Sequence, residues 1–260
     1  MNPILLELGP FQVRYYGVLM ALAFLIGFFI LRKLAKEKKV FKDLDQVADY
    51  VFWMAIGILV GARLLHCLVY EPDFYLTYPL EILYIWKGGL ASHGGMIGGT
   101  IAALIFARIK KIKFYRLADI TMVPVALGAM FVRLGNFTNG ELVGRVTPSW
   151  IGVEFDGYEG LRHPSQLYEA FKNFVIFLIM YKFNLMKKLP HGFVFWSFFF
   201  IYGIFRFIVE FWKDFPLYNG LTIGQYLSLP IIIIGALGIW LVTRRKLNAK
   251  KQPKKKKKSK

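Results

Sequence analysis

Long apolar runs, each bounded by charged or turn-forming residues, constrain the fold of this chain more than any other feature of its sequence. A helix needs about 20 residues to cross the hydrocarbon core of a bilayer, and each run approaches that length. The runs cover residues 16–31, 47–70, 90–107, 118–134, 167–183, 193–212 and 221–242. We therefore predict an all-α integral membrane protein, built as a bundle of about seven transmembrane helices.

The composition supports this prediction and excludes a nucleic-acid partner. Hydrophobic residues make up 56% of the 260 residues, which is more than the core of a soluble protein needs. The net charge of +18 comes from short basic clusters between the apolar runs and at the C-terminal end, not from one amphipathic face. Cys67 lies inside an apolar run, so we interpret it as a structural thiol and not as a nucleophile.

The charges between the runs predict the orientation of the helices. Lysines and arginines in short loops are retained on the cytoplasmic side of a membrane. They dominate residues 32–42, 108–116 and 182–188, whereas the connections at 71–89, 136–166 and 213–214 balance them with Asp and Glu. This alternation predicts that the N-terminus lies outside and the C-terminus inside.

Two segments fall outside the predicted bundle. Residues 136–166 are too many and too polar for a tight helix connection, and their Thr-Pro-Ser, Asp-Gly and His-Pro turn signals predict a small extracytoplasmic lobe. Residues 244–260 form a basic segment that we predict to be a disordered cytoplasmic tail touching anionic lipid headgroups. The expected organisation is thus a membrane domain of residues 1–243 followed by this tail.

Polar residues within or beside the apolar runs fall at one depth once the helices are oriented. Charged groups in a membrane are costly unless they are buried in the bundle and paired. The residues at this outer level are Tyr16, Arg63, His93, Arg133, Asn136, Asn139, Gln166, Glu169, Arg206 and Glu210. Few comparable groups occur in the inner half, so we predict a polar site that opens toward the outer leaflet.

The residue types at this level indicate a phosphate-containing ligand. Guanidinium groups bind phosphate through forked, charge-assisted hydrogen bonds, which makes Arg133 and Arg206 a candidate clamp. His93 can exchange a proton near neutral pH, so it is a candidate base for an incoming nucleophile. The four histidines show no ligand spacing, and we predict no metal site.

Each of these features also has an ordinary structural explanation. Gly94 and Gly95 either permit close helix packing or bring backbone amides near a lipid headgroup. Arg206 and Glu210 are four residues apart, which is the spacing of an ion pair along one helix. The shared depth of so many polar groups favours the site, because independent structural groups have no reason to lie at one level.

Several motifs resemble those of the prolipoprotein diacylglyceryl transferase family, over nearly the whole chain except the lysine-rich tail. The motifs are Arg14-Tyr15-Tyr16-Gly17, His93-Gly94-Gly95-Met96-Ile97-Gly98, the run from Arg133 through Asn136, Asn139 and Glu141 to Gly144, His163-Pro164-Ser165-Gln166-Leu167-Tyr168-Glu169, and Tyr202-Gly203-Ile204-Phe205-Arg206 with Glu210. One departure is Val143, where the family commonly has an aromatic residue. We expect this difference to affect fit more than chemistry.

The resemblance implies an enzyme of bacterial lipoprotein maturation in the cytoplasmic (inner) membrane. It implies phosphatidylglycerol as the donor and the lipobox cysteine in the signal peptide of a prolipoprotein as the acceptor. The products are then a thioether and glycerol phosphate, and no cofactor is expected.

The resemblance also implies roles for individual residues. It places His93, Arg133, Arg206 and Tyr16 in the catalytic machinery, with His163 as an alternative base. The expected substrate-binding residues are Arg133, Asn136, Asn139, Glu141, Gly144, Tyr202, Arg206 and Glu210, together with Gly94 and Gly95. Among these, we expect Asn136, Asn139 and Glu141 to orient headgroup hydroxyls or the arginines.

Two other function classes compete with this interpretation. A transporter of lipids or small anions would use the same arginines without chemistry, but the chain lacks the internal repeat from which many transporters are built. A structural membrane subunit would leave the arginine-rich motifs without a purpose.

Overall fold

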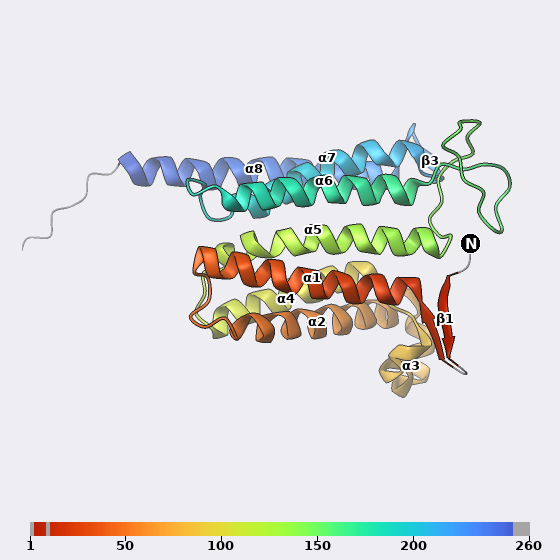
Figure 1. The fold of residues 1–260 in the computed structure, drawn as a ribbon, viewed down its shortest axis with the longest axis horizontal. Coiled ribbons are helices and arrows are strands. Elements are labelled where there is room, and N and C mark those ends of the chain that lie inside the picture. The colour runs from red at the N-terminus through yellow and green to blue at the C-terminus, as the bar shows by residue number, and fades with distance from the viewer. Residues whose placement is uncertain (1–2, 9–10, 252–260) are drawn as a thin grey trace, which may run out of the picture. The chain divides into compact units, whose positions relative to one another are not determined.

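A computed structural model describes residues 3–8 and 11–251, and it is mostly helical (Figure 1). The chain forms two compact units. The first unit contains the residues up to Leu31 and those from Asp119 onward, and the second contains Arg32–Ala118. Helices α1 (Tyr15–Lys38) and α5 (Phe114–Thr138) each contribute to both units.

Long helices make up most of the first unit. A hairpin of β1 (Ile4–Leu8) and β2 (Phe11–Arg14) precedes α1, and α5 is followed by α6 (Ser165–Leu185), α7 (Phe193–Val209) and α8 (Ile223–Lys251). A 3-10 turn, η4 (Glu210–Trp212), ends α7. The β1–β2 hairpin, the segment between α5 and α6, and β3 all lie at one end of these helices (Figure 1).

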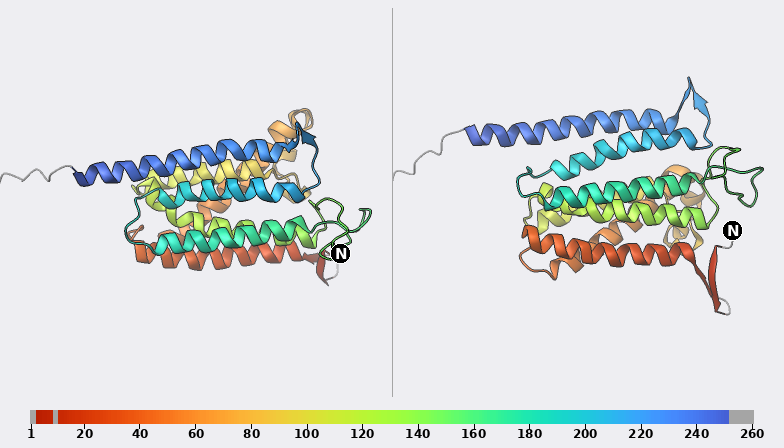
Figure 2. Two further views of the ribbon diagram at one scale, coloured as in Figure 1. Left: turned by 90° about the horizontal axis from the view of Figure 1, so that it is seen from above. Right: turned by 45° about the horizontal axis from the view of Figure 1, so that its top comes forward.

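Close packing joins α7 to α8 along their length (Figure 2). A Cβ atom added to Gly235 would lie 2.6 Å from the backbone nitrogen of Phe200, so only glycine permits this approach. Between the two helices, β3 (Leu217–Tyr218) pairs with β4 (Leu221–Thr222) through the turn residues Asn219 and Gly220. Both turn residues have positive φ, 49° and 84°, as a two-residue hairpin requires.

The second unit is built on the packing of two helices, α2 (Gln46–Leu65) and α4 (Ser92–Ile109). A Cβ atom added to Gly61 would lie 2.8 Å from the Cα of Gly98, so glycines let these two backbones touch. The connection between them contains a π-helical turn, η1 (His66–Tyr70), then α3 (Pro72–Thr77) and the 3-10 turns η2 (Pro79–Leu83) and η3 (Ile85–Lys87).

The structure is consistent with an all-α membrane protein. Helices occupy every predicted apolar run, and in the described residues five are long and apolar enough to cross a membrane. These are Tyr15–Lys38, Gln46–Tyr70, Phe114–Thr138, Phe193–Trp212 and Ile223–Asn248. Helices α4 and α6 are not among these five, so the count of about seven spans remains a prediction.

The structure corrects several predicted boundaries. Asn136 belongs to α5 and Gln166 to α6, so the predicted lobe at 136–166 is shorter at both ends. Isolated bridges such as Val146 to Arg162 organise what lies between. Helix α8 continues to Lys251, so the prediction of disorder is wrong for residues 244–251. Arg, Lys, Leu and Ala in this stretch favour a helix. The rest of the predicted tail, residues 252–260, lies outside the described residues.

Candidate active site

A buried carboxylate, Glu169, organises the polar residues of the first unit. Glu169 lies in the first turns of α6, and its side chain is only 1% exposed. It accepts hydrogen bonds from Arg206 Nη1 at 2.7 Å and from Lys172 Nζ, and it pairs with Lys213 Nζ at 2.6 Å. Arg133 Nε lies 3.9 Å from its other oxygen. One carboxylate on α6 therefore contacts cations from α5, α6, α7 and the segment after η4.

A second buried carboxylate, Glu210, completes this network. Arg206 Nη2 lies 3.3 Å and Lys213 Nζ 3.5 Å from Glu210 Oε2. Thr222 donates a hydrogen bond from Oγ1 to Glu210 Oε1 at 3.1 Å, which ties the start of α8 to the network. The intrahelical pair between Arg206 and Glu210 is therefore present, but it accounts for only part of the arginine's contacts, because Arg206 also reaches α6.

These ion pairs define a cluster that we call the arginine cluster: Arg133, Glu169, Lys172, Arg206, Glu210 and Lys213. Its four cations and two carboxylates leave two positive charges. The side chains of Arg133 and Arg206 are 20% and 21% exposed, whereas the other four are almost fully buried. The accessible part of the cluster is thus two guanidinium groups with a net positive charge behind them, which suits an anionic ligand.

A chain of hydrogen bonds leads from Arg133 to the surface. Arg133 Nη1 donates to Asn136 Oδ1 at 3.3 Å, and Asn136 Nδ2 donates to Glu141 Oε1 at 2.8 Å. Asn139 Nδ2 also donates to this oxygen, at 3.3 Å. Gln166 Nε2 donates a hydrogen bond to the backbone carbonyl of Glu141 at 2.7 Å. The structure therefore brings Asn136, Asn139 and Glu141 together beside Arg133.

Three further predicted residues belong to the same unit. The ring of Tyr16 packs against Gly135, where an added Cβ would lie 2.9 Å from its Cε2 atom. The ring of Tyr202 lies under Lys172, with Nζ 4.4 Å from the ring centroid. Gly144 donates its amide to the carbonyl of His163 at 2.9 Å, and a Cβ there would meet that same oxygen at 2.6 Å. Gly144 is thus required where the lobe backbone doubles back.

His93, Gly94 and Gly95 begin α4, in the second unit. His93 is exposed in the first turn of the helix. Gly94 and Gly95 are buried against α2, and Gly95 donates its amide to Ala91 at 3.1 Å. The amide of Gly95 is therefore hydrogen-bonded within the helix start, and close packing, one of the two explanations offered for these glycines, accounts for why both positions are glycine. A headgroup contact at these residues remains a prediction.

Arg63 was predicted at the same depth, but the structure gives it a structural task. Its guanidinium donates to the backbone carbonyls of Ile82 at 2.9 Å, Glu81 at 2.6 Å and Gly88 at 2.5 Å. It lies 5.1 Å from the ring centroid of Tyr75. Arg63 therefore fixes the connection between η1 and α4, with its donors directed at the protein's own backbone.

Polar residues also occur at the opposite end of the first unit, where the sequence predicted few. The carboxylate of Asp119 accepts the backbone amides of Gly192 at 2.7 Å and Phe195 at 2.9 Å, at the start of α7. Asn184 donates to the Asp119 carbonyl at 2.9 Å. These contacts satisfy the free amides of a helix start, so they are structural.

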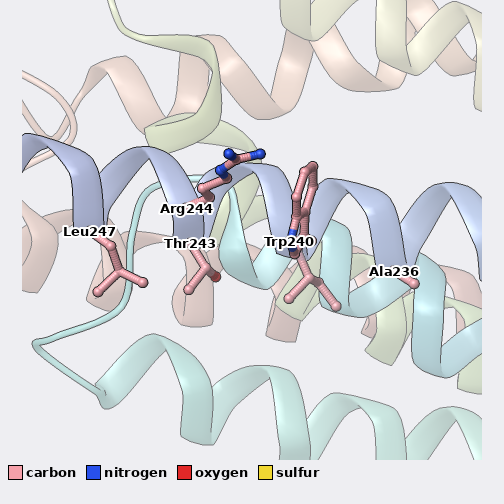
Figure 3. A pocket seen from close by; sticks show the side chains of 6 residues that line it. Ala236, Trp240, Thr243, Arg244 and Leu247 are labelled. Carbon is pink, nitrogen blue, oxygen red and sulfur yellow. The ribbon is translucent and has the colours of Figure 1, made fainter.

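Side chains of α8 line an open groove (Figure 3). Its lining residues are Ala236, Ile239, Trp240, Thr243, Arg244 and Leu247. Thr243 follows Thr222 by roughly 30 Å of helix at 1.5 Å per residue. The groove therefore has no part in the chemistry of the arginine cluster.

Comparison with known proteins decides which family this fold and cluster belong to. The family model for prolipoprotein diacylglyceryl transferase matches residues 3–241. The chain belongs to this family. The resemblance of its motifs is thereby confirmed, and the whole arginine cluster lies inside the part that matches.

Curated relatives agree with this assignment to the prolipoprotein diacylglyceryl transferase family. A protein of Geobacter sulfurreducens is 42% identical over 95% of this chain and 97% of its own length. Proteins of Tolumonas auensis and Rickettsia bellii are 41% and 40% identical, each over 94% of this chain and over 97% and 95% of their own lengths. All three are named phosphatidylglycerol–prolipoprotein diacylglyceryl transferase.

Two members of the arginine cluster were missed by sequence reasoning. Lys213 was counted only as a loop charge, yet it is buried; burial lowers its pKa, while Glu169 opposes that shift. Lys172 lies inside α6, three residues after Glu169. A lysine within an apolar helix is costly unless paired, so the Glu169–Lys172 spacing was the available signal.

Proposed function

We propose that this protein transfers the diacylglyceryl group of phosphatidylglycerol to the lipobox cysteine of prolipoproteins, with the arginine cluster as the binding site for the donor phosphate. Membership of the prolipoprotein diacylglyceryl transferase family makes the chain a transferase of lipoprotein maturation. The observation that supports the site is the convergence of Arg133 and Arg206 on Glu169. These guanidiniums come from different helices and keep one-fifth of their side chains accessible.

The proposed reaction is a displacement at the glyceryl carbon of the donor. A base removes the thiol proton of the acceptor cysteine, and we assign this task to His93. The sulfur then forms a C–S bond to the glyceryl carbon while the C–O bond to phosphate breaks, and the electron pair of that bond stays on the phosphate oxygen. Arg133 and Arg206 stabilise the charge that develops there, and glycerol phosphate leaves.

The remaining predicted residues orient the donor around the arginines. Asn136, Asn139 and Glu141 carry amide and carboxylate groups beside Arg133, which match the hydroxyls of a glycerol headgroup. Tyr202 supplies an aromatic ring beside Lys172, and Tyr16 supplies one against Gly135, two residues after Arg133. Gly144 permits the lobe backbone to pair with Lys213, just after η4.

The function is tested by incubating the purified protein with phosphatidylglycerol and a synthetic peptide that carries a lipobox cysteine. We expect the peptide to gain the mass of one diacylglyceryl group through a thioether that resists hydroxylamine, with glycerol phosphate released in equal amount. Binding of phosphatidylglycerol with no mass gain would favour a lipid transporter and contradict the proposal.

A Cys67→Ala variant sharpens this test. Cys67 is buried and has no place in the proposed reaction, because the nucleophile belongs to the acceptor peptide. We expect the variant to keep a transfer rate within about twofold of the original, since a small buried thiol behaves as an apolar residue. A well-folded but inactive Cys67→Ala protein would contradict the assignment of the nucleophile.

We further propose that the protein lies in the bacterial inner membrane with its N-terminus outside, its C-terminus inside and the arginine cluster toward the outer leaflet. The loop charges support this orientation. Reporters fused after residues 89, 150 and 214 should be extracytoplasmic, and those after 40, 112 and 188 cytoplasmic. The reversed pattern would move the site to the wrong side for an exported prolipoprotein.

A further inference from the structure

The two buried lysines of the arginine cluster are not used by the reaction as proposed so far. Lys172 and Lys213 are 2% and 5% exposed in their side chains, and both contact Glu169. Lys213 also contacts Glu210. Burying two ammonium groups carries a large desolvation cost. Charged residues buried in a membrane protein are therefore candidates for a functional role.

We propose that Glu169, Lys172 and Lys213 form a positioning unit that holds the two arginines together and sets the charge of the cluster to match the departing phosphate. The inference rests on the proposed function, because it concerns the same donor site. None of the three residues is assigned a contact with the substrate. They act through Arg133 and Arg206 and are positioning residues.

The positioning task belongs to Glu169. Two guanidinium groups repel each other at close range, and a shared carboxylate between them removes that repulsion. Glu169 places one oxygen 2.7 Å from Arg206 and the other 3.9 Å from Arg133, so it fixes how far apart the two side chains lie. A phosphate bound by both arginines needs this spacing to be constant.

The charge-setting task belongs to the lysines. With only the two arginines present, Glu169 and Glu210 would cancel both positive charges. Lys172 and Lys213 pair with these carboxylates and restore a net charge of two positive units. The exposed Glu141 lies outside the ion-pair network, where water and salt screen it.

This net charge matches the product better than the substrate. The phosphodiester of phosphatidylglycerol carries one negative charge, whereas a phosphate monoester such as glycerol phosphate carries about two near neutral pH. The attraction of the cluster therefore grows as the C–O bond breaks, which is the condition for an interaction that accelerates the reaction.

Lys172→Met and Lys213→Met test the charge-setting task. Each variant removes one positive charge behind the arginines and keeps a side chain of similar length. We expect kcat to fall about tenfold, and product inhibition by glycerol phosphate to weaken about tenfold, while KM for phosphatidylglycerol changes less than about threefold. Lys182→Met is the matched control, because Lys182 is an exposed lysine on the same helix, and it should change none of these quantities.

Glu169→Gln tests the positioning task. It should change inhibition by glycerol phosphate in the direction opposite to Lys172→Met and Lys213→Met. Removing a negative charge leaves three positive charges, so we expect glycerol phosphate to inhibit about tenfold more strongly, while kcat still falls because the arginines lose their shared anchor. Glu154→Gln, at an exposed carboxylate of the lobe, is the control. Should Glu169→Gln not fold, Glu169→Asp keeps the charge and shortens the reach, so it should lower kcat while changing glycerol phosphate inhibition less than about threefold.

The inference would be overturned if inhibition by glycerol phosphate shifted in the same direction in Lys172→Met and Glu169→Gln. It would also be overturned if inhibition shifted in neither variant. A purely structural role predicts a lower melting temperature in detergent and no such sign change. Arg133→Lys is measured in parallel. Full activity in that variant refutes the proposed site itself, whereas inactive arginine variants beside unchanged lysine variants refute only the positioning unit.

Discussion

Arg133→Lys and Arg206→Lys are each expected to lower the rate of diacylglyceryl transfer by about tenfold to more than a hundredfold, with little loss of folded protein. Lysine keeps the charge but has no planar fork, so Arg206→Lys cannot contact Glu169, Glu210 and a phosphate oxygen together. Losing one charge-assisted hydrogen bond costs roughly 1.5 to 3 kcal/mol. Each 1.36 kcal/mol of lost transition-state stabilisation is about tenfold in rate.

Initial rates with a lipobox peptide, measured beside melting temperatures in detergent, separate this expectation from a structural role. Arg244→Lys is a matched control, because Arg244 is an exposed arginine on α8 whose guanidinium lies 5.0 Å from the ring centroid of Trp240, far along the helix from the cluster. It should transfer at the original rate. Near-normal rates in well-folded Arg133→Lys and Arg206→Lys proteins would rule out the phosphate clamp.

Much of the helical fold was predictable because a membrane imposes a length and a polarity on each helix. The positions of α1, α2, α5, α7 and α8 follow directly from apolar runs. Their ends do not, since α5 continues to Thr138 and α8 to Lys251, in each case beyond the apolar stretch. The β1–β2 hairpin was missed because strands of five and four residues leave no extended alternation to detect.

The site was predicted through depth, which selects candidate polar residues but does not show their partners. Arg133, Arg206 and Glu210 were found this way, and Glu169 was placed at the right level without a role. Arg63 met the same criterion, yet its donors bind backbone carbonyls of the segment that follows it. The difference depends on where the chain after η1 folds back, and no spacing in the sequence contains that information.

Lysine within the network escaped prediction for a related reason. Loop charges were used to orient the helices, and Lys213 was counted as one of them. Its ammonium group is in fact buried between Glu169 and Glu210. Lys213 directly follows η4, and its place there makes a predicted surface charge a member of the cluster. Only the path of the chain after η4 distinguishes the two.

His93→Gln is expected to lower transfer by about a hundredfold to ten thousandfold at pH 7, because a positioned general base typically contributes that much. Glutamine keeps a polar side chain but cannot accept the thiol proton. The acceptor thiol has an ordinary pKa of about 8.5, so raising the pH from 7 to 9 supplies the thiolate without a base. The deficit of the variant should therefore shrink as the pH rises.

His163→Gln is the matched control for this prediction, since His163 is the alternative base. Its Nδ1 atom lies 3.0 Å from the hydroxyl of Tyr168, and its backbone carbonyl accepts the amide of Gly144, so its ring and backbone already have structural tasks. We expect its rate to fall less than about threefold at either pH, because its ring takes no part in proton transfer. Initial rates at saturating phosphatidylglycerol, measured from pH 7 to 9 for both variants, decide between them. A deficit of His93→Gln that stays constant across this range would make His93 a positioning residue, and a large deficit of His163→Gln that shrinks with rising pH would assign the base to His163 instead.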